Sequence, residues 1–224
     1  GGGEVGRWGG GQSAGRGGGR RSELGGGCHS VQVLAQTFQA MIEEDMALTR
    51  DEAIMMLKQL LENNPQFLTA WTFWKPDAFD GKDAAYVNEP GHDESGRFIS
   101  YWSRTDSGFV LEPIQGYDVE GSFKNNLEYV LQTGKSAIFE PYAYDFGGQN
   151  VLITSIVYPV VVDGQTLGMV GIDYSLESIH ERVSQITFYK TGFAALLSNE
   201  GTVISHKNLD IIGTNYFESP GMLA

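Results

Sequence analysis

The sequence predicts an α+β fold in which long N-terminal helices precede an antiparallel sheet. Apolar residues recur at helical spacing from Val31 onward, and β-prone segments separated by short turns follow later in the chain. With 224 residues, 41% of them hydrophobic, the chain can bury a sizeable core. We expect the helices to lie on one side of the sheet.

The first 29 residues are expected to form a disordered tail. Residues 1–27 contain fourteen glycines and four arginines and almost nothing apolar. Such a segment cannot offset the entropy that it would lose on ordering. The folded part is therefore expected to begin near residue 30.

Two helices are expected after this tail. The first carries Val31 and Phe38 on its apolar stripe. Thr49 and Glu52 have the spacing of a capping box, in which the threonine hydroxyl caps a new helix and the glutamate bonds back to it. This second helix should end before Pro65.

The remaining elements are mostly strands. Asp163-Gly164 marks a tight hairpin turn, and Ser175 is placed to cap a helix over residues 176–186. The strand over residues 151–162 is expected to be central in the sheet. The expected strands are 67–74, 97–104, 136–139, 151–162 and 166–173, with a short helix at 125–132 and a final hairpin of 192–198 and 202–206.

Composition excludes several functional classes. The net charge of −13 argues against a nucleic-acid partner and favours a cationic or zwitterionic ligand. Cys28 is the single cysteine, and the four histidines lack metal-ligand spacing, so we expect no disulfide, no metal and no cofactor. No nucleophile elbow, phosphate loop or metalloprotease motif occurs, so we expect no catalytic residues and no enzyme activity.

Several short motifs occur in an order that points to a known family. These are Asn64-Pro65-Gln66-Phe67-Leu68, Phe79-Asp80-Gly81-Lys82-Asp83, Gly96-Arg97-Phe98, Thr133-Gly134-Lys135, Glu140-Pro141-Tyr142, Gly168-Met169-Val170-Gly171-Ile172-Asp173, Lys190-Thr191-Gly192-Phe193-Ala194 and Asn199-Glu200-Gly201-Thr202. Over residues 30–218 the chain resembles the double Cache sensor domains of bacterial methyl-accepting chemotaxis proteins and sensor kinases.

The resemblance implies two stacked PAS-like lobes. Residues 30–186 would form the N-terminal helices and the membrane-distal, ligand-binding lobe, and residues 187–224 the truncated start of a membrane-proximal lobe. The sequence has no initiating methionine, signal peptide or run of 18 apolar residues, so we expect a fragment whose transmembrane helices flank it. It would be the periplasmic or extracellular part of an inner-membrane receptor, homodimeric when whole.

The implied function is sensing of a small ligand, most simply for chemotaxis. Alternatives are the sensor domain of a histidine kinase or of a cyclic-nucleotide enzyme, or a protein-interaction module without a ligand. In amino-acid-sensing relatives an Arg-x-Trp-Tyr motif binds the ligand carboxylate. Here Lys124-Asn125-Asn126-Leu127 replaces it, so a bidentate clamp is lost and Lys124 would supply only a point charge.

The resemblance assigns the ligand ammonium to Tyr142 and Asp173. Asp145 would be a second anion, and further aromatic residues would supply ring faces for cation–π contact. These are Trp74, Tyr101, Trp102 and Tyr144. An amine or quaternary ammonium is therefore favoured, with an amino acid next.

Each of these residues also has a purely structural interpretation. Trp74 in an alternating strand is typical of a core residue, and Asp173 would favour the N-terminus of the following helix. Tyr101 and Trp102 point to opposite faces of a regular strand, so at most one of them faces a given cavity.

Overall fold

One antiparallel sheet organises the part of the chain that the structure, a computed structural model, describes: residues 23–146, 149–188 and 192–218. The strands are β1 (Thr69–Trp74), β2 (Ser100–Thr105), β3 (Gly108–Pro113), β4 (Ala137–Ile138), β5 (Tyr142–Phe146), β6 (Gln149–Val162), β7 (Gln165–Ser175), β8 (Thr187–Phe188), β9 (Gly192–Phe193), β10 (Leu196–Leu197) and β11 (Val203–Ser205). The helices are α1 (Glu23–Glu43), α2 (Arg50–Glu62), α3 (Ser122–Thr133) and α4 (Leu176–Val183), with short 3-10 turns η1 (Asp83–Ala85), η2 (Leu209–Ile211) and η3 (Tyr216–Glu218). The predicted α+β class is confirmed.

The main sheet has the strand order β3–β2–β1–β7–β6–β4. Strand β5 pairs with a different stretch of the same β6 edge that β4 uses. As predicted, β6 is an interior strand, because β7 lies on one side of it and β4 and β5 on the other. All the pairings are antiparallel.

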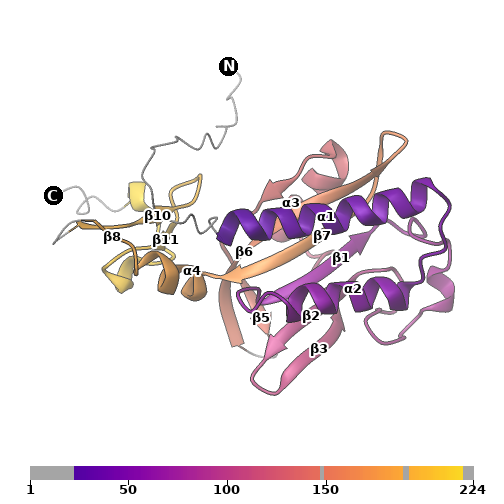
Figure 1. Ribbon diagram of the computed structural model, residues 1–224, viewed down its shortest axis with the longest axis horizontal. Coiled ribbons are helices and arrows are strands. Elements are labelled where there is room, and N and C mark those ends of the chain that lie inside the picture. Colours follow the sequence, from indigo (N-terminus) through magenta and orange to yellow (C-terminus); the bar gives the residue numbers. More distant parts are fainter. Residues whose placement is uncertain (1–22, 147–148, 189–191, 219–224) are drawn as a thin grey trace, which may run out of the picture.

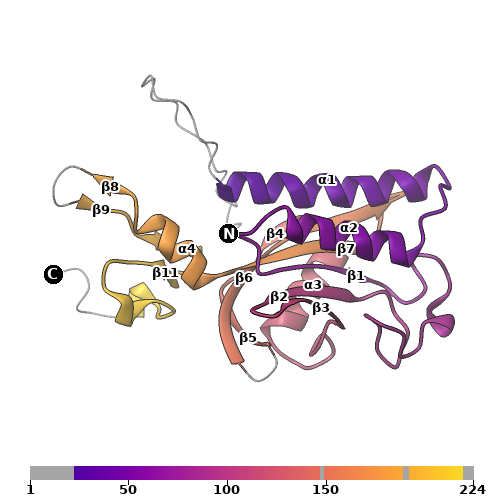
Figure 2. The same ribbon diagram turned by 60° about the horizontal axis from the view of Figure 1, so that its bottom comes forward.

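Helices cover both faces of this sheet. Helices α1 and α2 lie together on one face, and α3 lies against the other (Figures 1 and 2). The prediction that all helices share one side is therefore wrong for α3. Each face of the sheet has its own buried core, one under α1 and α2 and one under α3.

Helix α1 begins earlier than the composition predicted. It starts at Glu23, inside the glycine-rich stretch, whereas residues 1–22 lie outside the described part of the chain. Gly27 shows why glycine is tolerated here: a Cβ on this residue would lie 2.3 Å from the Tyr174 hydroxyl oxygen on β7. The missing side chain lets the first turns of α1 approach the sheet closely.

The predicted caps and turn are present. The Thr49 hydroxyl accepts the Glu52 amide at 3.3 Å, and the Glu52 carboxylate accepts the Thr49 amide at 2.9 Å. The Ser175 hydroxyl accepts the Ser178 amide at 3.0 Å and starts α4. Asp163 and Gly164 both have positive φ, as the tight β6–β7 hairpin requires.

Arg50, at the start of α2, binds the long loop between β1 and β2 through ion pairs and a hydrogen bond. Its side chain is fully buried, with guanidinium nitrogens 2.7 Å from Asp80 and 2.6 Å from Asp83. It also donates to the Gly96 carbonyl at 2.7 Å, and its guanidinium lies 4.3 Å from the Tyr86 ring centre. The acidic loop motif thus has a structural role.

A small second unit follows α4. It contains the pairs β8–β9 and β10–β11, which lie at one end of the main sheet (Figure 1). The His180 Nδ1 on α4 lies 3.0 Å from the Ser205 hydroxyl on β11, so helix and hairpin are in direct contact. The predicted final hairpin is confirmed only for residues 196–197 with 203–205, because residues 192–193 pair with β8 instead.

Candidate functional site

The candidate site is centred on the carboxylate of Asp173, near the end of β7. Asp173 lies directly opposite Thr69 of β1 on one side and Ser155 of β6 on the other. Both neighbouring strands therefore contribute side chains to the site. The Thr69 hydroxyl donates to Oδ2 at 2.6 Å, and the Trp71 Nε1–H donates to Oδ1 at 3.1 Å. The side chains of this sheet position therefore converge on one carboxylate.

This carboxylate is almost fully enclosed and has no ionic partner among the described residues. Asp173 is only 2% exposed, and the ion pairs of the described part of the chain do not include it. Burial raises the pKa of Asp173, and the hydrogen bonds of Thr69, Ser155 and Trp71 offset this only in part. A buried carboxylate without a counter-cation is unfavourable unless a partner arrives.

Aromatic rings surround Asp173 on the face of the sheet that α3 covers. Tyr142 and Tyr144 come from β5, and Tyr101 comes from β2, where it pairs with Trp71. Phe123 of α3 stacks on Tyr142 at a ring-centre distance of 5.6 Å. We call this set the aromatic cluster; it consists of Trp71, Tyr101, Phe123, Tyr142, Tyr144 and Phe146.

Burial and the nearby Asp173 carboxylate raise the pKa values of the tyrosine hydroxyls in the cluster. The pKa values of Tyr101 and Tyr142 are raised well above 10 by burial and then by the charge of Asp173, and burial is also the main cause that raises the pKa of Tyr144 to about 12. The Tyr142 hydroxyl lies 2.9 Å from that of Ser155. The buried Tyr101 hydroxyl lies next to the Thr69 side chain, which partly offsets the rise of its pKa. The three tyrosines therefore stay neutral, and their hydroxyl oxygens are of the kind that can accept hydrogen bonds.

The Trp71 ring of the aromatic cluster packs directly on the backbone of Gly171. Replacement of Gly171 by alanine should therefore destabilise the fold. An added Cβ would lie 2.2 Å from the Trp71 ring, which would have to lift off β7 and away from Asp173. We expect a loss of about 1–3 kcal/mol in the free energy of unfolding, measured in urea.

Gly26→Ala is the matched control, because its Cβ would meet nothing within 4 Å in helix α1. That change should stabilise the protein by up to about 1 kcal/mol. Equal unfolding midpoints for Gly171→Ala and the unmodified protein would contradict the close packing of Trp71.

Four of the predicted ligand residues come together here, namely Asp173, Tyr142, Tyr101 and Tyr144. Trp74 and Trp102 do not, and this corrects the predicted pocket. The Trp74 Nε1–H donates to the Thr72 hydroxyl at 2.7 Å, and the Trp102 Nε1–H donates to the Ile54 carbonyl at 3.0 Å. Both rings pack in the core under α1 and α2, because they lie an odd number of residues from Trp71 and Tyr101.

Lys124 and Asp145 also face away from the cluster. The Lys124 ammonium pairs with Glu120 and Glu128 along the partly exposed side of α3. Asp145 is exposed and lies between Tyr144 and Phe146 on β5, whose side chains face the cluster. Alternation along the strand therefore points its carboxylate to the other side.

The sequence prediction missed Thr69, Trp71, Phe123, Phe146 and Ser155 as parts of the site. Strand pairing is the signal that finds them: Thr69 and Ser155 lie directly opposite Asp173, and Trp71 follows Thr69 on the same face. Phe123 could be found only by knowing that α3 packs on the opposite face of β6 and β7 from α1, where its ring meets Tyr142 and Tyr144.

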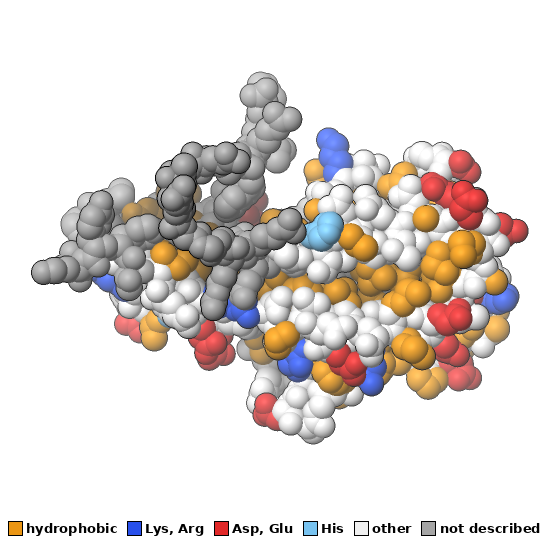
Figure 3. Space-filling model, viewed as in Figure 1, with side chains coloured by type: hydrophobic (Ala, Val, Ile, Leu, Met, Phe, Trp, Pro, Cys, Tyr) orange, Lys and Arg blue, Asp and Glu red, His pale blue; other side chains and the backbone are white. Residues whose placement is uncertain are grey.

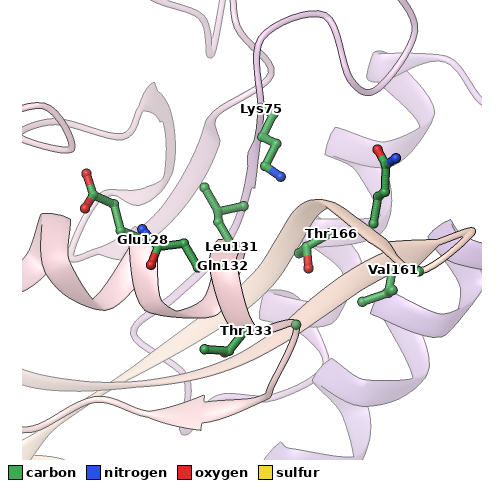
Figure 4. Close-up of a pocket in the computed structure, with 10 residues that line it drawn as sticks. Lys75, Glu128, Leu131, Gln132, Thr133, Val161 and Thr166 are labelled. Atoms are coloured by element: carbon green, nitrogen blue, oxygen red, sulfur yellow. The ribbon is translucent and has the colours of Figure 1, made fainter.

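Two hollows on the described surface lie elsewhere. The larger, of about 760 Å³, is lined by the end of α3 and the β6–β7 hairpin, and Lys75 and Thr166 point into it (Figure 4). The smaller, of about 290 Å³, lies between residues 88–94 and 113–118. We nevertheless place the candidate site at Asp173, because this buried carboxylate has no cationic partner within the described part of the chain, whereas the larger hollow is a polar surface feature.

The described residues offer no metal site and no membrane span. No group of three or more His, Cys, Asp or Glu side chains is arranged within them to hold a metal ion. None of the described helices has the length and apolarity needed to cross a bilayer.

Comparison with known proteins finds one family model and several related sensors. Residues 54–181 match the model described as methyl-accepting chemotaxis protein-like, first PDC sensor domain. The methyl-accepting chemotaxis protein TlpQ of Pseudomonas aeruginosa is 26% identical over 182 residues, which cover 74% of this chain and 25% of TlpQ. The chain thus spans about a quarter of that relative.

Solved structures show the same fold. The extracellular domain of the putative histidine kinase mmHK1S-Z3 is 33% identical, with a TM-score of 0.74, over 86% of this chain and 67% of that one. The ligand-binding domain of the Pseudomonas aeruginosa chemoreceptor PctB is 19% identical, with a TM-score of 0.55, over 88% of this chain and 70% of that one.

Proposed function

Because this chain belongs to the family of methyl-accepting chemotaxis protein-like first PDC sensor domains, we propose that it senses a small ligand that carries an ammonium group. The ligand would bind at Asp173 within the aromatic cluster and control signalling across a membrane, most simply for chemotaxis. One observation carries the proposal: a carboxylate that is 2% exposed has no cationic partner among the described residues.

The chemistry of the cluster fits an ammonium ion. Asp173 would supply the opposite charge, and the rings of Tyr101, Tyr142, Tyr144 and Phe123 would supply faces for cation–π contact, worth about 0.5–2 kcal/mol each. Neutral tyrosine hydroxyls would accept hydrogen bonds from a primary amine. The protein would act as a binding module and not as an enzyme.

The same chemistry disfavours a ligand carboxylate. The Lys124 ammonium is already paired with Glu128 of α3 and with Glu120, which precedes that helix, and no ion pair reaches Asp173 from the described residues. A carboxylate drawn into this enclosed cluster would lose its hydration without gaining a cation. An amino acid is the alternative ligand class, since the PctB domain that shares this fold was solved in complex with L-Arg.

The wider receptor is part of the proposal. The domain would face the periplasm or extracellular space, with residues 30–186 as the ligand-binding lobe and residues 187–224 as the start of a second lobe. A homodimer would use the face formed by α1 and α2, where hydrophobic side chains lie among acidic, basic and neutral ones (Figure 3). Val33 and Met55 are exposed hydrophobic residues on these two helices. The output would be a chemotaxis or a kinase module.

Ligands that differ by one carboxylate test the ammonium assignment. We expect choline to bind at least about tenfold more tightly than betaine, and butylamine more tightly than 4-aminobutyrate, because only the second member of each pair buries an anion. Isothermal titration calorimetry measures all four. The reverse preference would favour an amino-acid sensor. Binding of none of them would refute the ammonium proposal.

Lowering the pH should weaken choline binding through Asp173. Choline is charged at every pH, so the protein alone titrates. Because burial raises the pKa of Asp173 above its usual 3.8, affinity should be full above the raised pKa and fall as the pH drops through it. Without ligand the sign is opposite: ionisation of Asp173 lowers folding stability as the pH rises from 3.8 through the raised pKa.

Titrations of choline at several acidic pH values check this expectation, with unfolding measured alongside. The Asp173→Asn variant should lose both dependences on pH. Constant choline affinity of the unmodified protein across the acid range would contradict the role of this carboxylate.

A further inference from the structure

Glu140 joins the ligand-binding part of the sheet to the second unit. It lies between β4 and β5, two residues before Tyr142. Its Oε1 accepts the Glu200 amide at 3.1 Å, and Glu200 belongs to the turn between β10 and β11. Its Oε2 is buried and has no hydrogen-bond partner among the described residues. The carboxylate therefore binds the turn of the second unit through one oxygen, while its other oxygen has no partner among the described residues.

The backbone next to Glu140 is tied to the candidate site through Ser155. The Phe139 amide donates to the Ser155 carbonyl at 2.9 Å, and the Thr154 hydroxyl donates to the Phe139 carbonyl at 2.7 Å. The Ser155 side chain in turn lies beside Tyr142 and Asp173. A short run of hydrogen bonds therefore leads from Asp173 to the residue before Glu140.

Strand β5 is the wall of the site that a ligand must disturb. Asp173 is 2% exposed in this structure, so the cluster is closed over it. Three of the six rings of the cluster come from β5, which among the described strands is bonded to β6 alone. Admission of a ligand therefore displaces β5 side chains, and Glu140 precedes this strand directly.

We propose that Glu140 couples occupancy of the Asp173 site to the turn at Glu200 in the second unit. The inference rests on the proposed ligand-binding function. A ligand shifts a conformational equilibrium only by binding its states unequally. The open state would move β5 and with it the Glu140 carboxylate, whose unpaired oxygen favours a change of partner. The Glu200 amide would then lose its acceptor.

Amide hydrogen exchange of the Asn199–Gly201 turn, in the whole 224-residue chain, tests the coupling. We expect saturating choline to change the exchange rate of the Glu200 amide by about fivefold or more, the range of a modest coupling free energy. Glu140→Ala should abolish this response while choline affinity stays within about twofold. Glu140→Gln, which keeps an acceptor oxygen, should restore it. Choline binding without a change at Glu200, or an unaltered change in Glu140→Ala, would overturn the coupling.

A second arm needs no ligand, so it separates this inference from the proposed function. Tyr142→Ala removes the side chain beside Ser155. It should change the exchange rate of the Glu200 amide when Glu140 is present, but not when Glu140 is replaced by alanine. His180→Ala, which breaks a different contact with the second unit, should leave the effect of Tyr142→Ala in place. If choline does not bind but this cycle shows coupling, the ammonium proposal fails alone. Additive effects of Tyr142→Ala and Glu140→Ala would overturn the coupling itself.

Discussion

Replacement of Asp173 by asparagine is expected to lower choline affinity by about thirtyfold to several thousandfold, because loss of one member of a buried charge pair costs about 2–5 kcal/mol. The same change should leave the free energy of unfolding near pH 7 unchanged or higher. In the ligand-free protein the carboxylate is enclosed without a counter-cation among the described residues, so its ionisation opposes folding. Calorimetric titration and urea unfolding measure the two effects on the same sample.

Asp145→Asn is the matched control for this prediction. It makes the same chemical change on the exposed side of β5, next to Tyr144. Choline affinity should change by less than about twofold, since exposed charges are well screened. Equal losses in the two variants would mean that the overall negative charge attracts choline and that Asp173 has no specific role.

Arg50→Met should produce the largest loss of stability among these variants. The side chain is fully buried and contacts Asp80, Asp83 and the Gly96 carbonyl. Removal of the guanidinium leaves two carboxylates near each other without a cation, and such losses cost about 3–5 kcal/mol. Urea unfolding measures the change, with an unaltered m-value expected if the folded state stays compact.

Two further variants separate the charge effect from the loss of packing. The triple change Arg50→Met, Asp80→Asn, Asp83→Asn removes the uncompensated charges and should regain part of the stability. Lys58→Met breaks an exposed ion pair with Glu62 and should cost less than about 1 kcal/mol. Arg50→Met as mild as Lys58→Met would show that the loop does not depend on this network.

Local chemistry explains why much of the fold could be predicted. The Thr49 capping box, the Ser175 cap and the Asp163-Gly164 turn each involve residues within a few positions of one another. Their structures depend little on the rest of the chain. Strands β3 and β5 were missed because both alternate between partly buried and exposed residues at a margin of the sheet, without a long apolar run.

The candidate site depended on contacts that sequence spacing does not contain. The family resemblance singled out Asp173 and Tyr142, and aromatic character singled out Tyr101 and Tyr144, which the structure places together. Trp74 and Trp102 are equally aromatic, but the register of β1 with β7 and of β1 with β2 places them on the other face. Phe123 entered the site only because α3 crosses to that face. Strand register and helix placement, which are tertiary properties, therefore decided the membership of the cluster.

The division of the sheet into two independent cores makes this domain suited to reprogramming as a sensor. Tyr101, Phe123, Tyr142 and Tyr144 belong to the α3 side, whereas the side chains under α1 and α2 belong to a separate core. A library that varies these four positions can change the shape and polarity of the proposed recognition surface without altering how the N-terminal helices pack on the sheet. Selection for new ligands and retention of the framework thus become nearly separate problems.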